Sequence, residues 1–174
     1  MEELQKVRVA FYRGSRDEWN HRFIRWWTKS DFSHAELVLP GGETWVSISP
    51  FIFSRVSAKV VVNPRHEDWV YVDLWVTESR VRALKEFISE TTGDRYDWVG
   101  MLLSQVLPFI VKGKGRWYCS SWIAHALSHA GIVKWKRLGI YEFPDLHPGR
   151  LHEILVRSVE LPKDDTSESQ QLPH

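Results

Sequence analysis

Segments with the pattern of β-strands lie together in the first half of the chain, and this grouping limits the possible folds more than any other feature. From Val7 to Tyr12, apolar residues alternate with period two, as in a half-buried strand. Four more strand-like segments follow: 34–39, 44–48, 58–62 and 69–75. A Pro40-Gly41-Gly42 turn separates the first two of these. Strands grouped in this way are typical of an α+β domain with an antiparallel sheet.

Four segments have apolar residues at the spacing of an amphipathic helix. They are 15–29, 77–93, 98–107 and 119–131. Ser15 and Glu18 have the spacing of a capping box at the start of the first, and Thr77 is a suitable N-cap for the second. Gly93 and Gly131 are well placed to end the second and the fourth. The sequence therefore predicts one helix within the strand-rich region and three after it.

The length of the chain favours one domain. Its 174 residues are enough to bury a real core and too few for two domains of ordinary size, so we predict a single domain over 1–160. Residues 161–174 are too polar to pack, and we expect a disordered tail there. Several of the ten tryptophans fall on apolar faces of predicted elements and are expected in the core rather than in ligand stacking. These are Trp19, Trp26, Trp27, Trp69, Trp75 and Trp122.

Charge and hydropathy argue against two classes of partner. A formal net charge of +1 gives no electrostatic reason to expect nucleic acid. The longest uncharged run, 98–111, is shorter than the roughly 20 apolar residues that span a bilayer, so we predict no transmembrane segment. A buried helix and an interfacial segment are the two interpretations of this run. The acidic N-terminus leads into a strand and predicts no signal peptide; we expect synthesis in the cytoplasm, with the final compartment left open.

Cys119 is the only cysteine of the chain, and it stands where the last predicted helix begins. It cannot form an intrachain disulfide, and it would need several other ligands to hold zinc. Two interpretations remain, a small buried hydrophobe and a nucleophile. A helix N-terminus stabilises a negative charge by roughly 0.3–1 kcal/mol, less than one pKa unit. A nucleophilic Cys119 therefore requires a histidine partner.

His34 is the strongest candidate for that partner. It begins a predicted strand, and Glu36, two residues later, points to the same face. Two charged side chains on an otherwise apolar strand are costly in a core unless they bind each other. Glu36 can favour the protonated form of the His34 ring. A strand face that is exposed to solvent explains the spacing equally well. His125 and His129 have the spacing of a metal pair, but no third ligand is evident. We assign both to solvent and predict no metal and no cofactor.

Three short motifs, taken in their order, carry a family resemblance. They are Ser33-His34-Ala35-Glu36-Leu37-Val38 on a strand, Tyr96-Asp97 before a helix, and Tyr118-Cys119-Ser120-Ser121 at the start of a later helix. The chain resembles the circularly permuted NlpC-type papain-like cysteine hydrolases over roughly residues 7–155, and bacterial and phage members look most similar. Ordinary papain-like enzymes have the cysteine helix before the histidine strand, whereas the permuted group and this chain have the reverse order.

The resemblance implies a permuted papain-like α+β fold in which the antiparallel sheet that carries the histidine packs against the helix that starts at the cysteine. By position, Cys119 would be the nucleophile, His34 the general base and Glu36 the third polar residue. In many relatives the orienting group comes from the neighbouring strand, where this chain offers Thr44 and Ser47. Members of the family hydrolyse or transfer acyl groups at amides and esters, including peptidoglycan peptides and lipids.

Three functions follow as hypotheses. The first is a thiol hydrolase of amidase or endopeptidase type that acts through an acyl-enzyme, with cell-wall peptides as a candidate substrate and a virion as a candidate location. The second is a lipid acyl hydrolase or acyltransferase that docks on membranes through 98–111. The third is a non-catalytic structural module of a larger assembly, for example a phage tail; the placement in phage rests on analogy alone.

Overall fold

The computed structural model describes residues 3–13, 30–48, 55–96, 116–140 and 146–160, and the following account concerns these residues. They form an α+β structure with one antiparallel sheet of five strands, which confirms the predicted fold class. The strands are β1 (Leu4–Tyr12), β2 (His34–Val38), β3 (Thr44–Ile48), β4 (Val56–Val60) and β5 (Trp69–Thr77), in the order β4-β3-β2-β1-β5. β2 therefore lies in the middle of the sheet, next to β1 and β3.

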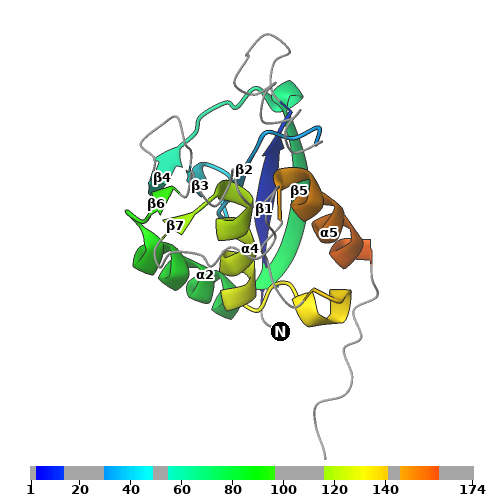
Figure 1. The fold of residues 1–174 in the computed structure, drawn as a ribbon. Helices are drawn as coiled ribbons and strands as arrows, with labels where there is room; N and C mark the ends of the chain where they lie inside the picture. The colour runs from blue at the N-terminus through cyan, green and yellow to red at the C-terminus, as the bar shows by residue number, and fades with distance from the viewer. Residues whose placement is uncertain (1–2, 14–29, 49–54, 97–115, 141–145, 161–174) are drawn as a thin grey trace, which may run out of the picture.

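Three helices cover one face of this sheet. They are α2 (Glu78–Thr91), α4 (Cys119–His129) and α5 (Pro148–Glu160). In Figure 1, α4 and α5 lie in front of strands, and α2 lies at the lower left; α2 contacts β1 and β5. α4 contacts β2 and β3 and lies between the other two helices. Short elements connect this framework: the 3-10 turns His66–Asp68 and Trp135–Leu138, and the parallel pair β6 (Arg95–Tyr96) and β7 (Arg116–Trp117), which leads directly into α4.

The main core lies between the sheet and the helices because successive side chains of a strand point to opposite faces. On β1 the inward residues Val7, Val9 and Phe11 are completely buried. They pack with the apolar residues of α4, of which Trp122 and Leu127 are also completely buried. Burial of one face of each element in this way is what fixes α4 against the sheet, and it fixes the position of the first residue of that helix.

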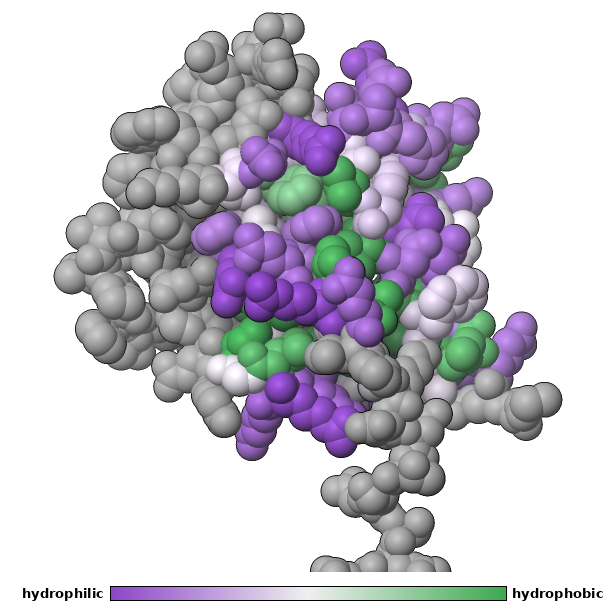
Figure 2. All heavy atoms as spheres, turned by 90° about the vertical axis from the view of Figure 1, so that its right-hand side faces the viewer, coloured by the Kyte–Doolittle hydropathy of each residue, from purple (hydrophilic) through white to green (hydrophobic). Residues whose placement is uncertain are grey.

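The opposite face of the sheet carries a smaller apolar cluster, and it is more polar and rich in aromatic rings. Its buried apolar residues are Ala10, Val38 and Trp45, and Glu36, which pairs with Ala10, is buried on the same face. Arg8 and Asp73, on neighbouring strands, form an ion pair there. Figure 2 shows the side of the molecule that carries β5 and α5, where small hydrophobic groups lie among hydrophilic residues.

Most of the predicted strands and helices within the described residues are confirmed. β3 has the predicted bounds, whereas β4 begins two residues before the predicted segment, and β5 continues to Thr77. Helices are found at Glu78–Thr91 and Cys119–His129, but α5 was not predicted. The predicted helices at 15–29 and 98–107 and the tail at 161–174 lie outside the described residues.

The expectation that tryptophans on apolar faces lie in the core is confirmed in one case and wrong in another. Trp122 is completely buried, and its indole N–H donates to Thr91 Oγ1 at 2.9 Å. Trp75 is 57% exposed, because its neighbours Leu74 and Val76 take the inward positions of β5 and leave Trp75 on the outer face. Trp69 is half-buried, and Trp19, Trp26 and Trp27 lie outside the described residues.

In the part of the chain that the structure describes, no helix combines the length and the apolar character needed to cross a bilayer. The uncharged run 98–111 lies outside the described residues.

Candidate active site

Cys119 is the first residue of α4 and lies against the middle strand of the sheet. The residue is only 6% exposed and belongs to the main core. The first hydrogen bond of the helix runs from the N–H of Trp122 to the carbonyl oxygen of Tyr118. The N–H groups of the preceding turn have no partner within the helix itself, as at any helix N-terminus. The thiol is therefore held where backbone N–H groups favour a negative charge.

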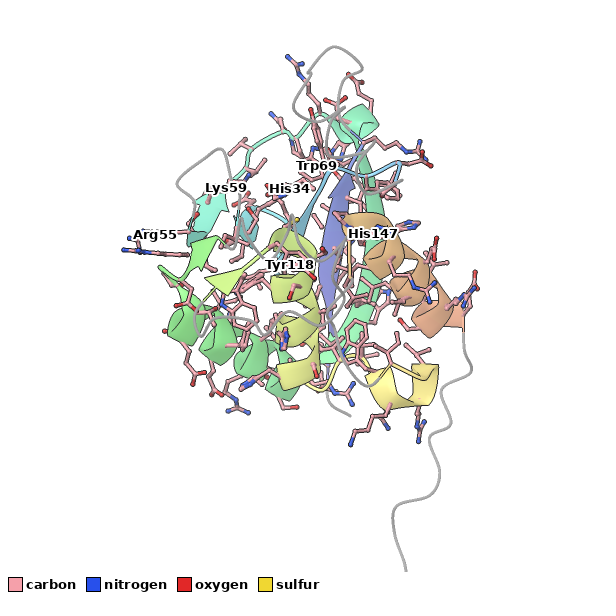
Figure 3. All side chains as sticks on the ribbon, viewed as in Figure 1. His34, Arg55, Lys59, Trp69, Tyr118 and His147 are labelled. Atoms are coloured by element: carbon pink, nitrogen blue, oxygen red, sulfur yellow. The ribbon has the colours of Figure 1, made fainter. Side chains whose placement is uncertain are left out.

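His34 is the first residue of β2, at the end of the strand beside the start of α4. Its backbone pairs with Tyr12 of β1, and its side chain is 13% exposed. In Figure 3, His34 lies beside the helix end that carries Tyr118. The His34 ring and the Cys119 thiol lie close enough for each to shift the pKa of the other. The structure thus brings together two residues that are distant in the sequence.

Glu36 binds the other side of the same ring. His34 Nε2 lies 3.1 Å from Glu36 Oε1, which leaves Nδ1 as the ring nitrogen available to the thiol. The Glu36 side chain is only 4% exposed, so the contact is shielded from water. The same-face geometry of residues two apart on a strand, which the sequence predicted, produces this contact. The alternative that this face is open to solvent is wrong for Glu36.

Lys59 completes the group from the edge of the sheet. It lies on β4, and its Nζ is 2.8 Å from Glu36 Oε1, the oxygen that also contacts His34. The Lys59 side chain is 48% exposed. Sequence reasoning missed this residue, although a lysine within an otherwise uncharged strand segment was a signal for it. We call Cys119, His34, Glu36 and Lys59 the charge chain.

The thiol of Cys119 is easier to ionise than an ordinary thiol. Burial alone would raise its pKa, but the His34 imidazolium and its hydrogen bond to the sulfur outweigh burial and lower the pKa below its usual value. The backbone N–H groups of Ala35 and Ser120 also bind the sulfur and act in the same direction. A contact to the backbone of β2 at Ala35 shows how closely the helix start approaches the strand.

The pKa values of His34 and Glu36 also shift in the directions that favour their charged forms. Burial alone would lower the pKa of His34, but the Cys119 thiolate and the Glu36 carboxylate raise that pKa to about 10. Burial alone would raise the pKa of Glu36, but His34 and Lys59 lower it below its usual value. The three shifts all favour the charged forms, a thiolate at Cys119, an imidazolium at His34 and a carboxylate at Glu36, so that charges of opposite sign lie next to one another.

Other polar residues singled out in the sequence lie elsewhere. Ser47 is buried on β3 and pairs with Ser57 of β4, whereas the contact to the His34 ring is made by Glu36. His129 is exposed, and its ring lies 5.3 Å from that of Phe87. The ring of His125 lies 4.9 Å from that of Trp117, and the residue is half-buried rather than fully in solvent.

Tyr96 lies on β6, and Asp97 lies outside the described residues. Among the residues that the structure describes, no three His, Cys, Asp or Glu side chains are grouped so as to hold a metal ion. No model of a known protein family matches the chain, and no curated protein matches its sequence. The charge chain is therefore interpreted from its own geometry.

Proposed function

We propose that this chain is a cysteine hydrolase that cleaves amide or ester bonds through an acyl-enzyme on Cys119. The observation that carries the proposal is the grouping of Cys119, His34 and Glu36 at the junction of α4 and β2, where His34 Nε2 lies 3.1 Å from Glu36 Oε1 and the His34 ring lowers the pKa of the Cys119 thiol. A nucleophile beside a base whose ring is held by a third group is the arrangement that activates thiols and hydroxyls in hydrolases. A cysteine that served only as a small hydrophobe would not need a buried imidazole and carboxylate beside it.

In the first half of the proposed reaction, Cys119 Sγ attacks the carbonyl carbon and forms a tetrahedral intermediate. The N–H groups at the start of α4 stabilise the developing oxyanion. The bond from carbon to the leaving nitrogen or oxygen then breaks, and the leaving group takes a proton from the His34 imidazolium. The product of this half is a thioester on Cys119.

In the second half, His34 acts as the base. The now neutral ring takes a proton from a water molecule, which attacks the thioester carbonyl and releases the carboxylic acid together with the Cys119 thiolate. Glu36 keeps the ring oriented and stabilises its charged form through the 3.1 Å contact to Nε2. The starting state of the charge chain is thereby restored.

We further propose that the α+β fold is a circularly permuted papain-like one. Two observations support this. The strand that begins at His34 precedes the helix that begins at Cys119 in the chain, and α4 packs on the sheet with its first residue against that strand. Peptidoglycan peptides and acyl esters are the two substrate classes to which this interpretation points, and both carry the required carbonyl group.

Alkylation by iodoacetamide at about pH 6 tests the reactivity of the only thiol. An ordinary thiol with a pKa of about 8.5 is almost entirely protonated there, so we expect Cys119 to react about 10- to 100-fold faster than a free cysteine. His34→Ala should abolish this advantage, whereas His66→Ala, which removes an exposed histidine that contacts Tyr71, should preserve it. Intact-mass spectrometry follows the single label.

A Cys119 that reacts no faster than free cysteine, or a rate that His34→Ala leaves unchanged, contradicts the proposal. Cleavage is measured separately, with isolated peptidoglycan and with a chromogenic acyl ester. The wild-type protein should cleave at least one of these and accumulate an acyl adduct of defined mass, whereas Cys119→Ala should retain the fold by circular dichroism and cleave neither. A reactive thiol with no cleavage of any amide or ester would favour the non-catalytic structural module.

A further inference from the structure

We propose that Lys59 is a positioning residue of this site, which holds the Glu36 carboxylate in the orientation and the ionised state that His34 requires. The inference rests on the proposed function. It starts from the contact at one oxygen, because Glu36 Oε1 lies 3.1 Å from His34 Nε2 and 2.8 Å from Lys59 Nζ. Figure 3 shows Lys59 on β4, to one side of His34.

The second carboxylate oxygen of Glu36 is held by no described group. Glu36 Oε2 is buried and has no hydrogen-bond partner among the described residues. The described contacts that orient the carboxylate are therefore both at Oε1. An ionised carboxylate out of contact with water is stable only when it is paired. With Lys59 removed, the His34 imidazolium would be the remaining cation in contact with Glu36 among the described residues.

The position of Lys59 suits a residue that acts through Glu36 rather than on the substrate. Its strand, β4, is separated from β2 by β3, and its side chain reaches inward from a half-exposed place while Glu36 is only 4% exposed. Lys59 thus joins the buried end of the charge chain to solvent without touching Cys119. It supplies the outermost positive charge, and this charge favours the carboxylate over the carboxylic acid.

The test uses Lys59→Met, which keeps the length of the side chain and removes its charge, and Lys59→Arg, which keeps a positive charge. Lys6→Met is the matched control, because Lys6 lies 3.8 Å from a different carboxylate, that of Asp73. Along β1, Lys6 is six residues from the partner of His34, which is about 20 Å along a strand. The first measurement is the titration of the Glu36 carboxyl carbon by NMR, assigned with Glu36→Gln.

We expect Lys59→Met to raise the titration midpoint of Glu36 by about one unit, the lower end of the usual effect of a nearby charge, because Lys59 is half-exposed. The pH below which Cys119 alkylation slows should rise as well, because the His34 imidazolium is no longer stabilised by a Glu36 carboxylate that Lys59 holds in place. Lys59→Arg should restore both values in large part, and Lys6→Met should leave both unchanged.

An unchanged Glu36 midpoint in Lys59→Met overturns the proposal. A raised midpoint with an unchanged alkylation profile also overturns it, because Lys59 would then be only a structural ion pair. Failure of the proposed function gives a different result: wild-type Cys119 would alkylate like free cysteine and would not respond to His34→Ala. In that case no positioning role exists, whatever the Glu36 titration shows.

Discussion

Neutralising Glu36 while keeping its shape should lower the pKa of His34 and narrow the pH range of the thiolate–imidazolium pair. Glu36→Gln removes the negative charge that contacts His34 Nε2 at 3.1 Å and leaves an acceptor oxygen in place. Two unit charges about 4 Å apart interact by about 4 kcal/mol at an effective dielectric constant of 20, equivalent to about 3 pKa units. Lys59, at 2.8 Å from the same oxygen, is present in both proteins, so its repulsion of the imidazolium does not enter the difference, and about 3 units is the upper end of the expected range.

The expected shift is therefore a fall of about 1 to 3 units from the His34 pKa of about 10. The pH at which kcat/KM falls on the basic side should decrease by the same amount, because His34 without its proton can no longer protonate the leaving group. NMR titration of the His34 ring, with Cε1-labelled histidine, measures the pKa directly, and the pH dependence of kcat/KM measures its effect on turnover.

The matched control is Asp73→Asn. Asp73 lies on β5 and pairs with Arg8 on the same sheet, so this change also neutralises one paired carboxylate but does so outside the charge chain. It should leave the His34 titration where it is. A Glu36→Gln protein whose His34 still titrates near the wild-type value would refute the reasoning, since the 3.1 Å contact would then contribute nothing to the imidazolium.

Two further predictions concern stability. Because the folded pKa of Glu36 is below its usual value, its ionised form contributes stability above the unfolded pKa of about 4.3, and this contribution is lost as the pH falls through the folded pKa. Urea unfolding at a series of pH values over this range should therefore show that the free energy of unfolding depends more steeply on pH in the wild type than in Glu36→Gln. An equal dependence on pH in the two proteins would contradict the lowered pKa. Trp122→Phe removes the completely buried 2.9 Å bond to Thr91 and should lower the free energy of unfolding by about 1–3 kcal/mol, whereas a loss near zero would mean that Thr91 Oγ1 finds another donor.

Local patterns were enough to predict the parts of the fold that depend on local periodicity. The alternation at Thr44–Ile48 predicted the bounds of β3, and the i, i+2 relation predicted that His34 and Glu36 share one strand face, where the structure places them in contact. The start of β4 was two residues off because pairing decides it: Ser57 pairs with Ser47 of β3, and the preceding Arg55 forms a bridge to Arg95. Alternation along one strand does not show these partners.

The parts of the site that were missed are also non-local. Lys59 reaches Glu36 from a strand two places away in the sheet, and the sequence does not state which strands are neighbours. The binding of the Cys119 sulfur by the backbone N–H of Ala35 depends on the packing of α4 against β2. Backbone contacts of this kind leave no trace in residue types.

The junction of α4 and β2 has a consequence for when Cys119 can gain the reactivity that we propose for it. His34 and Cys119 are separated by 119 − 34 = 85 positions, and until α4 packs on the sheet Cys119 is an ordinary thiol with a pKa of about 8.5. A chain under synthesis is therefore expected to carry a thiol of ordinary reactivity until both elements have been made and have docked. Loosening of this docking should silence the thiol while helices and strands persist, so that the rate of alkylation reports on native packing.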